Sequence, residues 1–234
     1  MTNVLRLPTR PAGTAAAGEP GADSVAVRFT VGAVVARARE TGALPAGCGP
    51  AAGYAGLVLA DRDAATVEAF DLTTGAVLGA ERLTVVPHEL LTRADLVVLR
   101  YRAAGGPADA PALRLFRQAL ADAERDALGE AVRWCRRFLA GRRSAGQRLS
   151  AHPVVAYQMA GLVARAAALR QADAAAALAV PAGRAWWVRE VDGLARDLIR
   201  MAGGRSVLTG QMAQMRTALL YANRIYLDGA PCSD

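Results

Sequence analysis

The sequence contains no lysine: all 28 of its basic residues are arginine, against 21 acidic residues. Chemistry that needs a lysine amine is therefore excluded, including Schiff-base catalysis, a pyridoxal-phosphate enzyme and a P-loop nucleotide site. The formal charge of +7 does not by itself predict nucleic-acid binding. The arginines are spread among acidic residues, and neither interleaved aromatic residues nor a nucleic-acid motif accompanies them, so no nucleic-acid partner is expected.

Other absences narrow the class of protein further. No apolar run approaches the roughly 20 residues of a membrane span, and residues 1–23 lack the apolar core of a signal peptide. The three cysteines are widely spaced and odd in number, which argues against a disulfide framework. The two histidines have no cluster of Cys or carboxylate residues beside them, so no metal site is expected. A cytoplasmic protein that is not bound to a membrane is the expectation.

The chain divides into four parts by composition and pattern. A disordered leader is predicted over residues 1–23, a small β-rich or mixed region over 24–102, a linker over 103–111 and a helical bundle over 112–230. Within the second part, a Gly/Pro loop is expected at residues 43–56 and a hairpin turn at 71–75. Short β-type runs are predicted at Leu57–Ala60, Thr66–Leu72, Ala76–Val86 and Asp95–Arg102.

Four helical patterns follow the linker, at about residues 112–139, 153–169, 185–201 and 211–227. Each carries one apolar stripe at helical spacing, and Pro153 stands where an N-terminal helix proline belongs. The connections between them are short, which favours antiparallel neighbours. The sequence therefore predicts a mainly α fold, in which an antiparallel four-helix bundle is preceded by a small β-rich or mixed α/β region.

The turns of this bundle carry a resemblance to acyl-CoA dehydrogenases. RRSAGQRL (residues 142–149) resembles the family's R-x-x-F-G-x-x-L signature, and MAGGRSV (201–207) resembles its Q-x-x-G-G-x-G turn. IYLDGA (225–230) resembles the closing I-Y-E-G-T with one residue inserted, and VPHELL (86–91) resembles V-P-x-E-x-L-L with one residue missing. The four matches occur in the family's order, and together they imply the C-terminal bundle of that family with a remnant of its middle domain.

The resemblance implies roles for five residues. Arg142 matches the arginine that meets the pyrophosphate of FAD held mainly by a neighbouring subunit, and Gly203 and Gly204 match a turn that lets backbone approach that cofactor. Asp228 stands where the family has the carboxylate that removes the α-proton of an acyl thioester while hydride passes to flavin. Gly229 matches the glycine that follows this carboxylate, and the resemblance implies that it contacts the cofactor. From the residues alone, a solvated arginine, an ordinary helix stop and an ordinary helix end remain open alternatives at these positions.

The sequence also departs from the family. Orthodox members are nearly twice as long, and this chain has no room for their N-terminal helical domain. Nothing resembles the middle-domain motif T-E-P-x-x-G-S-D, and no tryptophan precedes the bundle to match W-I-T. The expected aromatic residue of the loop is Ala145, the expected Gln before the glycines is Arg200, and the closing Thr is Ala230. A complete flavin site is therefore not expected on this chain alone.

Three hypotheses follow. The chain is a reduced family member, in a homo-oligomer or in a hetero-oligomer with a full-length dehydrogenase, and completes an FAD and acyl-thioester site across the interface. Alternatively, it has lost flavin and performs proton transfer or cyclisation on an acyl or polyketide-like substrate of specialised metabolism, using a pocket that contains Asp228 or another buried carboxylate. In the third hypothesis it is an assembly protein without catalysis.

Overall fold

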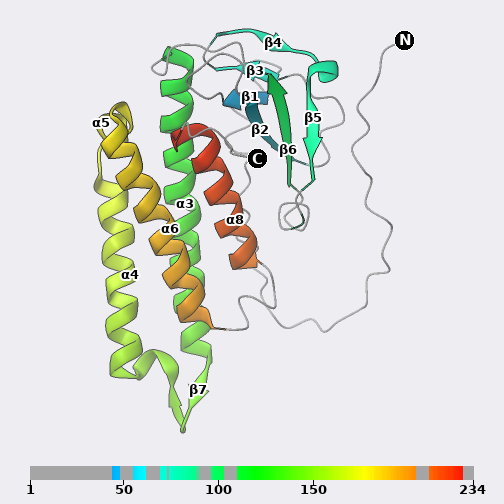
Figure 1. Cartoon of the computed structure of the whole chain (residues 1–234). Coiled ribbons are helices and arrows are strands. Elements are labelled where there is room, and N and C mark those ends of the chain that lie inside the picture. The colour runs from blue at the N-terminus through cyan, green and yellow to red at the C-terminus, as the bar shows by residue number, and fades with distance from the viewer. Residues whose placement is uncertain are drawn as a thin grey trace, which may run out of the picture.

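A computed structural model describes residues 44–47, 55–61, 69–72, 74–87, 89, 96–102, 110–203 and 211–228. The expected leader, residues 24–43 of the expected β-rich or mixed region and most of the expected linker lie outside the described residues, as does His88. The described part consists of a helical bundle and a small sheet beside its upper end (Figure 1). The predicted fold class is confirmed.

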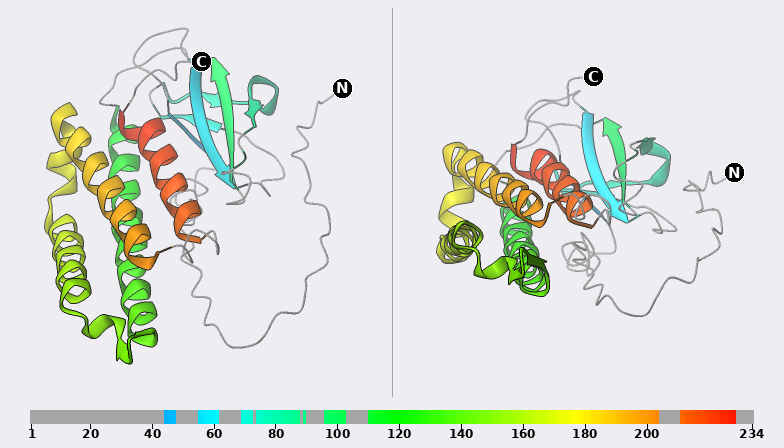
Figure 2. Two further views of the ribbon diagram at one scale, coloured as in Figure 1. Left: turned by 60° about the horizontal axis from the view of Figure 1, so that its bottom comes forward. Right: turned by 90° about the horizontal axis from the view of Figure 1, so that it is seen from below.

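Four long helices form the bundle. They are α3 (Pro111–Gly141), α4 (Pro153–Gln171), α6 (Pro181–Ala202) and α8 (Gln211–Asn223), with the short α5 (Ala174–Ala179) before α6. Three of the four begin at a proline, which has no amide hydrogen to lose at a helix start. The chain runs down α3, up α4, down α6 and up α8, so the neighbours are antiparallel (Figures 1 and 2). The first helix exceeds the predicted range by one or two residues at each end.

Two short elements complete the bundle. At the lower end, β7 (Arg143–Ser144) and β8 (Gln147–Arg148) form a hairpin, which the 3-10 turn η2 (Leu149–Ala151) joins to α4. At the upper end, α8 continues into a π-helical turn, η3 (Arg224–Asp228). The predicted fourth helix therefore changes its geometry over its last residues.

The sheet has six strands in the order β4-β3-β1-β2-β6-β5. Its strands are β1 (Leu44–Gly47), β2 (Ala55–Asp61), β3 (Ala69–Asp71), β4 (Val77–Leu78), β5 (Thr84–Val86) and β6 (Leu96–Arg102), and the 3-10 turn η1 (Ala80–Arg82) lies between β4 and β5. Only β1 and β3 pair in parallel. The prediction of a loop throughout residues 43–56 is wrong at β1, which forms because β2 and β3 supply partners on both of its edges.

The expected hairpin turn is confirmed between β3 and β4, which pair antiparallel. Asp71 closes it: its Oδ1 accepts a hydrogen bond from the Thr74 amide at 3.2 Å, and its carbonyl accepts one from the Gly75 amide at 2.8 Å. Gly75 has φ 75°, a left-handed conformation that glycine adopts without steric cost. The predicted run Ala76–Val86 divides into β4, η1 and β5 because β4 and β5 lie at opposite edges of the sheet.

The core of the bundle is packed around α3 and α6. Trp187, Leu194 and Leu198 of α6 meet Leu120 and Leu128 of α3, and all five are almost completely buried. By contrast, α4 is apolar on most of its circumference but buries only three residues, Met159, Leu162 and Leu169. A helix that is hydrophobic on all sides is normally buried. The large apolar surface that α4 exposes is therefore unusual for a surface helix.

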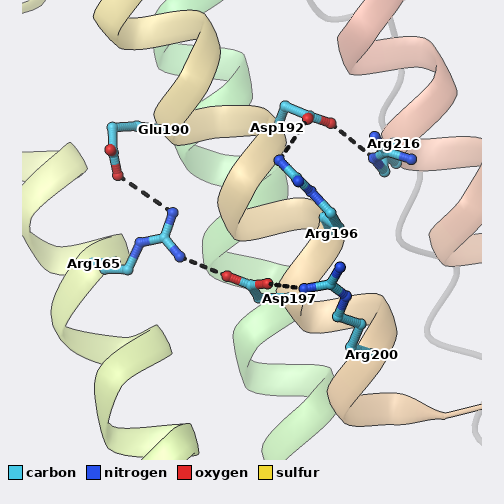
Figure 3. A network of polar contacts seen from close by, with 7 residues as sticks. All are labelled: Arg165, Glu190, Asp192, Arg196, Asp197, Arg200 and Arg216. Carbon is cyan, nitrogen blue, oxygen red and sulfur yellow. Dashed lines mark hydrogen bonds and ion pairs between the residues drawn. The ribbon is translucent and has the colours of Figure 1, made fainter.

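Ion pairs join α6 to both of its neighbours (Figure 3). Arg165 of α4 reaches Asp197 at 2.8 Å and Glu190 at 3.4 Å, and Arg216 of α8 reaches Asp192 at 2.8 Å. These side chains are partly exposed, so each pair contributes at most about 1 kcal/mol. Their main effect is to fix the relative rotation and register of α4, α6 and α8.

Gly183 lies where α6 contacts the backbone of α5, and it provides a test of this packing. A Cβ at position 183 would lie 2.0 Å from the carbonyl oxygen of Ala177 in α5. We therefore predict that Gly183→Ala lowers the free energy of unfolding by about 1–3 kcal/mol, because backbone atoms must move. Gly161→Ala in α4 is the matched control: nothing lies within 4 Å of its Cβ, so it should gain about 0.5–1 kcal/mol of helix stability. Equal effects in chemical denaturation would contradict the α5–α6 packing.

Candidate functional site

Arginines hold the backbone that leads into Asp228 at the upper end of the bundle. Arg117 of α3 donates a hydrogen bond from Nε to the carbonyl oxygen of Tyr226 at 2.8 Å, and Arg184 of α6 donates one to that of Leu227 at 3.1 Å. The Tyr226 ring also packs on Phe116, with ring centroids 4.6 Å apart. The π turn is therefore anchored from two helices immediately before Asp228, whose side chain lies outside the described part of the chain.

The π turn also accounts for the residue inserted in the family-like ending. A π turn takes up one residue more than an α turn, and such turns are rare and concentrate at functional sites. An extra residue in an α-helix would rotate every later side chain by about 100°. In η3 the residues Arg224–Asp228 adopt this wider π geometry.

A buried carboxyl lies two helical turns below Arg117 on the same face of α3. Glu124 has no exposed surface, and its Oε2 accepts a hydrogen bond from Nε1 of Trp187 at 2.7 Å. The Asn223 amide of α8 faces this carboxyl without meeting the geometry of a hydrogen bond. Among the described residues, Glu124 Oε1 and both amide atoms of Asn223 therefore have no hydrogen-bond partner.

Burial controls the charge of Glu124. It raises the pKa of the carboxyl to about 8, and the hydrogen bond from Trp187 and the nearby Asn223 amide offset only part of this effect. The side chain is therefore a neutral, proton-carrying acid at neutral pH, which is a common property of acid–base groups in active sites. The sequence contained a signal for it, since Glu124 interrupts the apolar stripe of α3 between Leu120 and Leu128, but the stripe was interpreted as core alone.

The hairpin end of the bundle carries Arg142. This residue follows the last turn of α3, and its guanidinium lies 5.2 Å from the centre of the Phe138 ring, which stacks on Trp134 at 5.1 Å. Ala145 and Gly146 have φ 49° and 80°, as a two-residue type I′ hairpin turn requires. Arg142 itself is exposed. Its side chain is thus oriented by an aromatic surface and is accessible to an anion.

The two glycine motifs are described only in part. Gly203 ends α6 with φ 70°, and its amide donates to the carbonyl oxygens of Ile199 and Arg200. Among the described residues, nothing lies within 4 Å of the position that a Cβ at Gly203 would take. Gly204 and Gly229 lie outside the described residues, and their proposed roles stay predictions.

The structure separates the predicted site residues rather than bringing them together. Arg117 touches the segment before Asp228, and Arg142 lies 25 residues further along the same straight helix axis. At 1.5 Å per residue, the two ends are about 37 Å apart. Figure 2 shows the hairpin and η3 at opposite ends of the bundle. Gly203 lies towards the hairpin end, where α6 terminates.

A groove of about 880 Å³ runs between the lower part of α3 and α4. Arg133, Arg136 and Arg137 line its α3 side, and Val155, Met159 and Val163 are among the residues on its α4 side.

No group of three or more His, Cys, Asp or Glu in the described ranges could hold a metal ion. None of the described helices combines the length and the hydropathy that a membrane span requires.

Comparison with solved structures identifies the fold. The chain resembles a glutaryl-CoA dehydrogenase from Mycobacterium smegmatis in complex with FADH2 (TM-score 0.52, 16% identity), covering 79% of this chain and 57% of that one. It also resembles the FAD complex of PigA (TM-score 0.50, 12% identity), covering 79% of this chain and 63% of that one. An acyl-CoA dehydrogenase from Geobacillus kaustophilus matches at TM-score 0.46 and 15% identity, over 79% and 60% of the two chains.

The likeness to the glutaryl-CoA dehydrogenase, at a TM-score of 0.52, shows that this chain has the fold of an acyl-CoA dehydrogenase, as the resemblance of the turns predicted. The chain spans about three fifths of the length of these structures. No protein-family model matches the sequence, and no curated protein matches it either.

We predict that Glu124 makes the folded protein less stable as the pH rises. An unfolded Glu loses its proton near pH 4.5, whereas Glu124 keeps its proton up to about pH 8 in the folded protein. Because the folded state binds one more proton between these values, the contribution of Glu124 to the free energy of unfolding falls by about 1.4 kcal/mol per pH unit across this window. Chemical denaturation at a series of pH values measures the slope.

The Glu124→Gln variant provides the comparison, because Gln resembles the protonated carboxyl and cannot titrate. Its stability should exceed that of the wild type increasingly as the pH approaches 8. Asp122→Asn, at an exposed carboxylate on the same helix, should retain the wild-type slope. Identical slopes in the wild type and Glu124→Gln would show that this carboxyl is not protonated in the core.

Proposed function

We propose that this chain is an acyl-CoA dehydrogenase-like subunit that contributes to a flavin and acyl-thioester site shared with a second chain. The fold supports the family-like part of this proposal. The distance of about 37 Å along α3 between Arg142 and the segment of Asp228 supports a site that is formed by two chains. One ligand molecule cannot bridge two such distant points, so Arg142 of one chain works with the Asp228 end of another, in a homo-oligomer or with a full-length dehydrogenase.

The hairpin end fits the anionic part of FAD. Arg142 is exposed, and its guanidinium fork suits the oxygens of a pyrophosphate. The Phe138 ring beneath it restricts the side chain, which lowers the entropy that binding costs. Arg143 and Arg148 of the hairpin add positive charge. Flavin, when bound, accepts the hydride from the β-carbon of the substrate.

The η3 end supplies the base. We assign to Asp228 the removal of the α-proton of the acyl thioester, which leaves the electron pair to form the new C=C bond as hydride departs from the β-carbon. An Asp reaches one methylene less far than the Glu of the family, so its backbone must be placed accurately. Arg117 and Arg184 provide that placement through the carbonyls of Tyr226 and Leu227.

The test uses the affinity-tagged chain, purified from the organism that produces it as a complex with any bound partner chain. The complex should show the visible spectrum of flavin, and an acyl thioester should bleach it. Asp228→Asn should keep the colour and lose bleaching by about 100-fold or more, since general base catalysis contributes that much. Arg142→Gln should weaken flavin retention by about tenfold or more, while Arg148→Gln, at an exposed arginine of the same hairpin, should change it less. A yellow complex that bleaches normally in Asp228→Asn would contradict the assignment.

A second candidate function rests on Glu124. A neutral carboxyl in the bundle core, beside an unpartnered Asn223 amide, suits a flavin-free enzyme that moves protons on an acyl or polyketide-like substrate. In that case the purified chain is colourless and exchanges α-hydrogens of an acyl thioester with deuterium from the solvent. Glu124→Gln should abolish this exchange, and Asp122→Asn should preserve it. A colourless chain without exchange would leave the non-catalytic assembly role.

A further inference from the structure

The net positive charge of the chain is concentrated in one part of the bundle. Residues 131–172, which form the last third of α3, the β7–β8 hairpin and α4, contain 8 of the 28 arginines and none of the 21 acidic residues. The rest of the chain carries the other 20 arginines and all 21 acidic residues, so it is close to neutral. The surface formed by α4 and the lower end of α3 therefore favours an anionic partner.

The groove between α3 and α4 lies within this basic part of the bundle. Its α3 side carries Arg133, Arg136 and Arg137, all of which are exposed, and no acidic side chain of the described residues lines it. Glu130 pairs with both Arg133 and Arg137. Arg136, by contrast, forms no ion pair or hydrogen bond with any described residue. The α3 side of the groove therefore keeps a guanidinium group available to an anion.

The α4 side of the groove is apolar along its whole length. Its lining residues run from Val155 to Ala167, and all of them are Val, Ala or Met. At 1.5 Å per residue this wall is about 18 Å long, so the groove volume of about 880 Å³ corresponds to a channel about 7 Å across. A helix with its side chains is about 10–12 Å wide and does not fit such a channel. An extended acyl chain does, and the volume lies in the range of small-molecule sites, roughly 300–1,000 Å³.

We propose that this groove binds a single-chain amphiphile with an anionic head, such as a long-chain fatty acid or an alkyl phosphate. The acyl chain lies along the apolar wall of α4, where its methylene groups are removed from water. The head lies at Arg136, because a guanidinium fork suits the oxygens of a carboxylate and of a phosphate alike. Arg133 and Arg137 lie within one turn of Arg136 and add positive charge beside the same head.

Other occupants of the groove fit less well. Residues 1–43 contain five arginines and three acidic residues, so this part of the chain is itself cationic and is repelled by the groove arginines. An anionic bilayer would contact the protruding Tyr157, which is 82% exposed, and would leave the narrow channel unfilled. The groove arginines begin about 24 Å along α3 from Arg117, which holds the backbone before Asp228. The inference therefore goes beyond the proposed acyl-thioester chemistry and does not rest on it.

Isothermal titration calorimetry of the full chain tests the proposal with dodecanoate and with dodecyl phosphate, each below its critical micelle concentration. At least one of them should bind with one molecule per chain, and the ratio of the two affinities identifies the preferred head. Hexanoate should bind about 100-fold more weakly than dodecanoate, because it buries fewer methylene groups. Dodecyltrimethylammonium has the same chain with a cationic head, and it should bind about tenfold or more weakly than the anionic amphiphile.

Two variants locate the site in the groove. Arg136→Gln should weaken binding of the anionic amphiphile by about tenfold or more, because it removes a charge-assisted hydrogen bond. Ala160→Trp should weaken it by a similar factor, because the indole ring fills the channel beside α4. Both positions are exposed, so neither substitution disturbs the core. Arg189→Gln, at an exposed arginine of α6, is the matched control and should leave the affinity unchanged.

Several results would overturn the proposal. They are the absence of binding by both anionic amphiphiles, equal binding of the cationic one, and unchanged affinity in either groove variant. Cosedimentation with phosphatidylglycerol vesicles by a chain that binds neither anionic amphiphile would show that the surface recognises a bilayer instead. Binding that appears only after an oligomer is diluted into monomers would show that a second copy fills the groove. The proposed function fails separately, since a colourless chain that binds dodecanoate has this site and a yellow, bleachable complex that binds no amphiphile lacks it.

Discussion

The length and burial of α3 are the constraint on which the rest of the structure depends. This 31-residue helix contacts every other long helix of the bundle or the turn that follows it, and its inner face supplies much of the core. Its upper end holds η3 through Arg117, its middle buries Glu124 against Trp187, and its lower end leads into the hairpin of Arg142. Because one straight helix joins all three points, their separations are fixed.

Because α3 is rigid, the family-like motifs at its two ends keep a fixed distance from each other. Two of the motifs that resemble acyl-CoA dehydrogenases lie at opposite ends of the bundle, so a single chain keeps Arg142 and the segment of Asp228 far apart. A shared site between chains resolves this separation without moving any helix.

Local patterns predicted the helices well because their apolar stripes decide both helix formation and burial. The first helix and the turn at Asp71–Gly75 follow the sequence closely for this reason. The strand β1 could not be predicted, because its residues favour a loop and only pairing with distant β2 and β3 makes it a strand. The register of the sheet depends on the same non-local contacts.

The sequence indicated residues for the candidate site, but it did not indicate where they lie relative to one another. Likeness to the family's motifs indicated Arg142, Gly203 and Asp228, and their roles stay predictions. Glu124 was missed, since an apolar pattern cannot tell a neutral buried acid from a surface charge until Trp187 and Asn223 are placed around it. The π turn was missed because it depends on Arg117 and Arg184, which are far away in sequence.

The most direct measurement of the central claim is size-exclusion chromatography of the flavin-bearing protein, with the mass of the eluting species read by light scattering. A site shared between chains predicts that visible flavin absorbance elutes only with species that contain at least two chains, and is lost when they dissociate on dilution. Flavin absorbance that elutes with a single chain of 24.4 kDa would contradict the account, since one α3 cannot bring both ends to one cofactor.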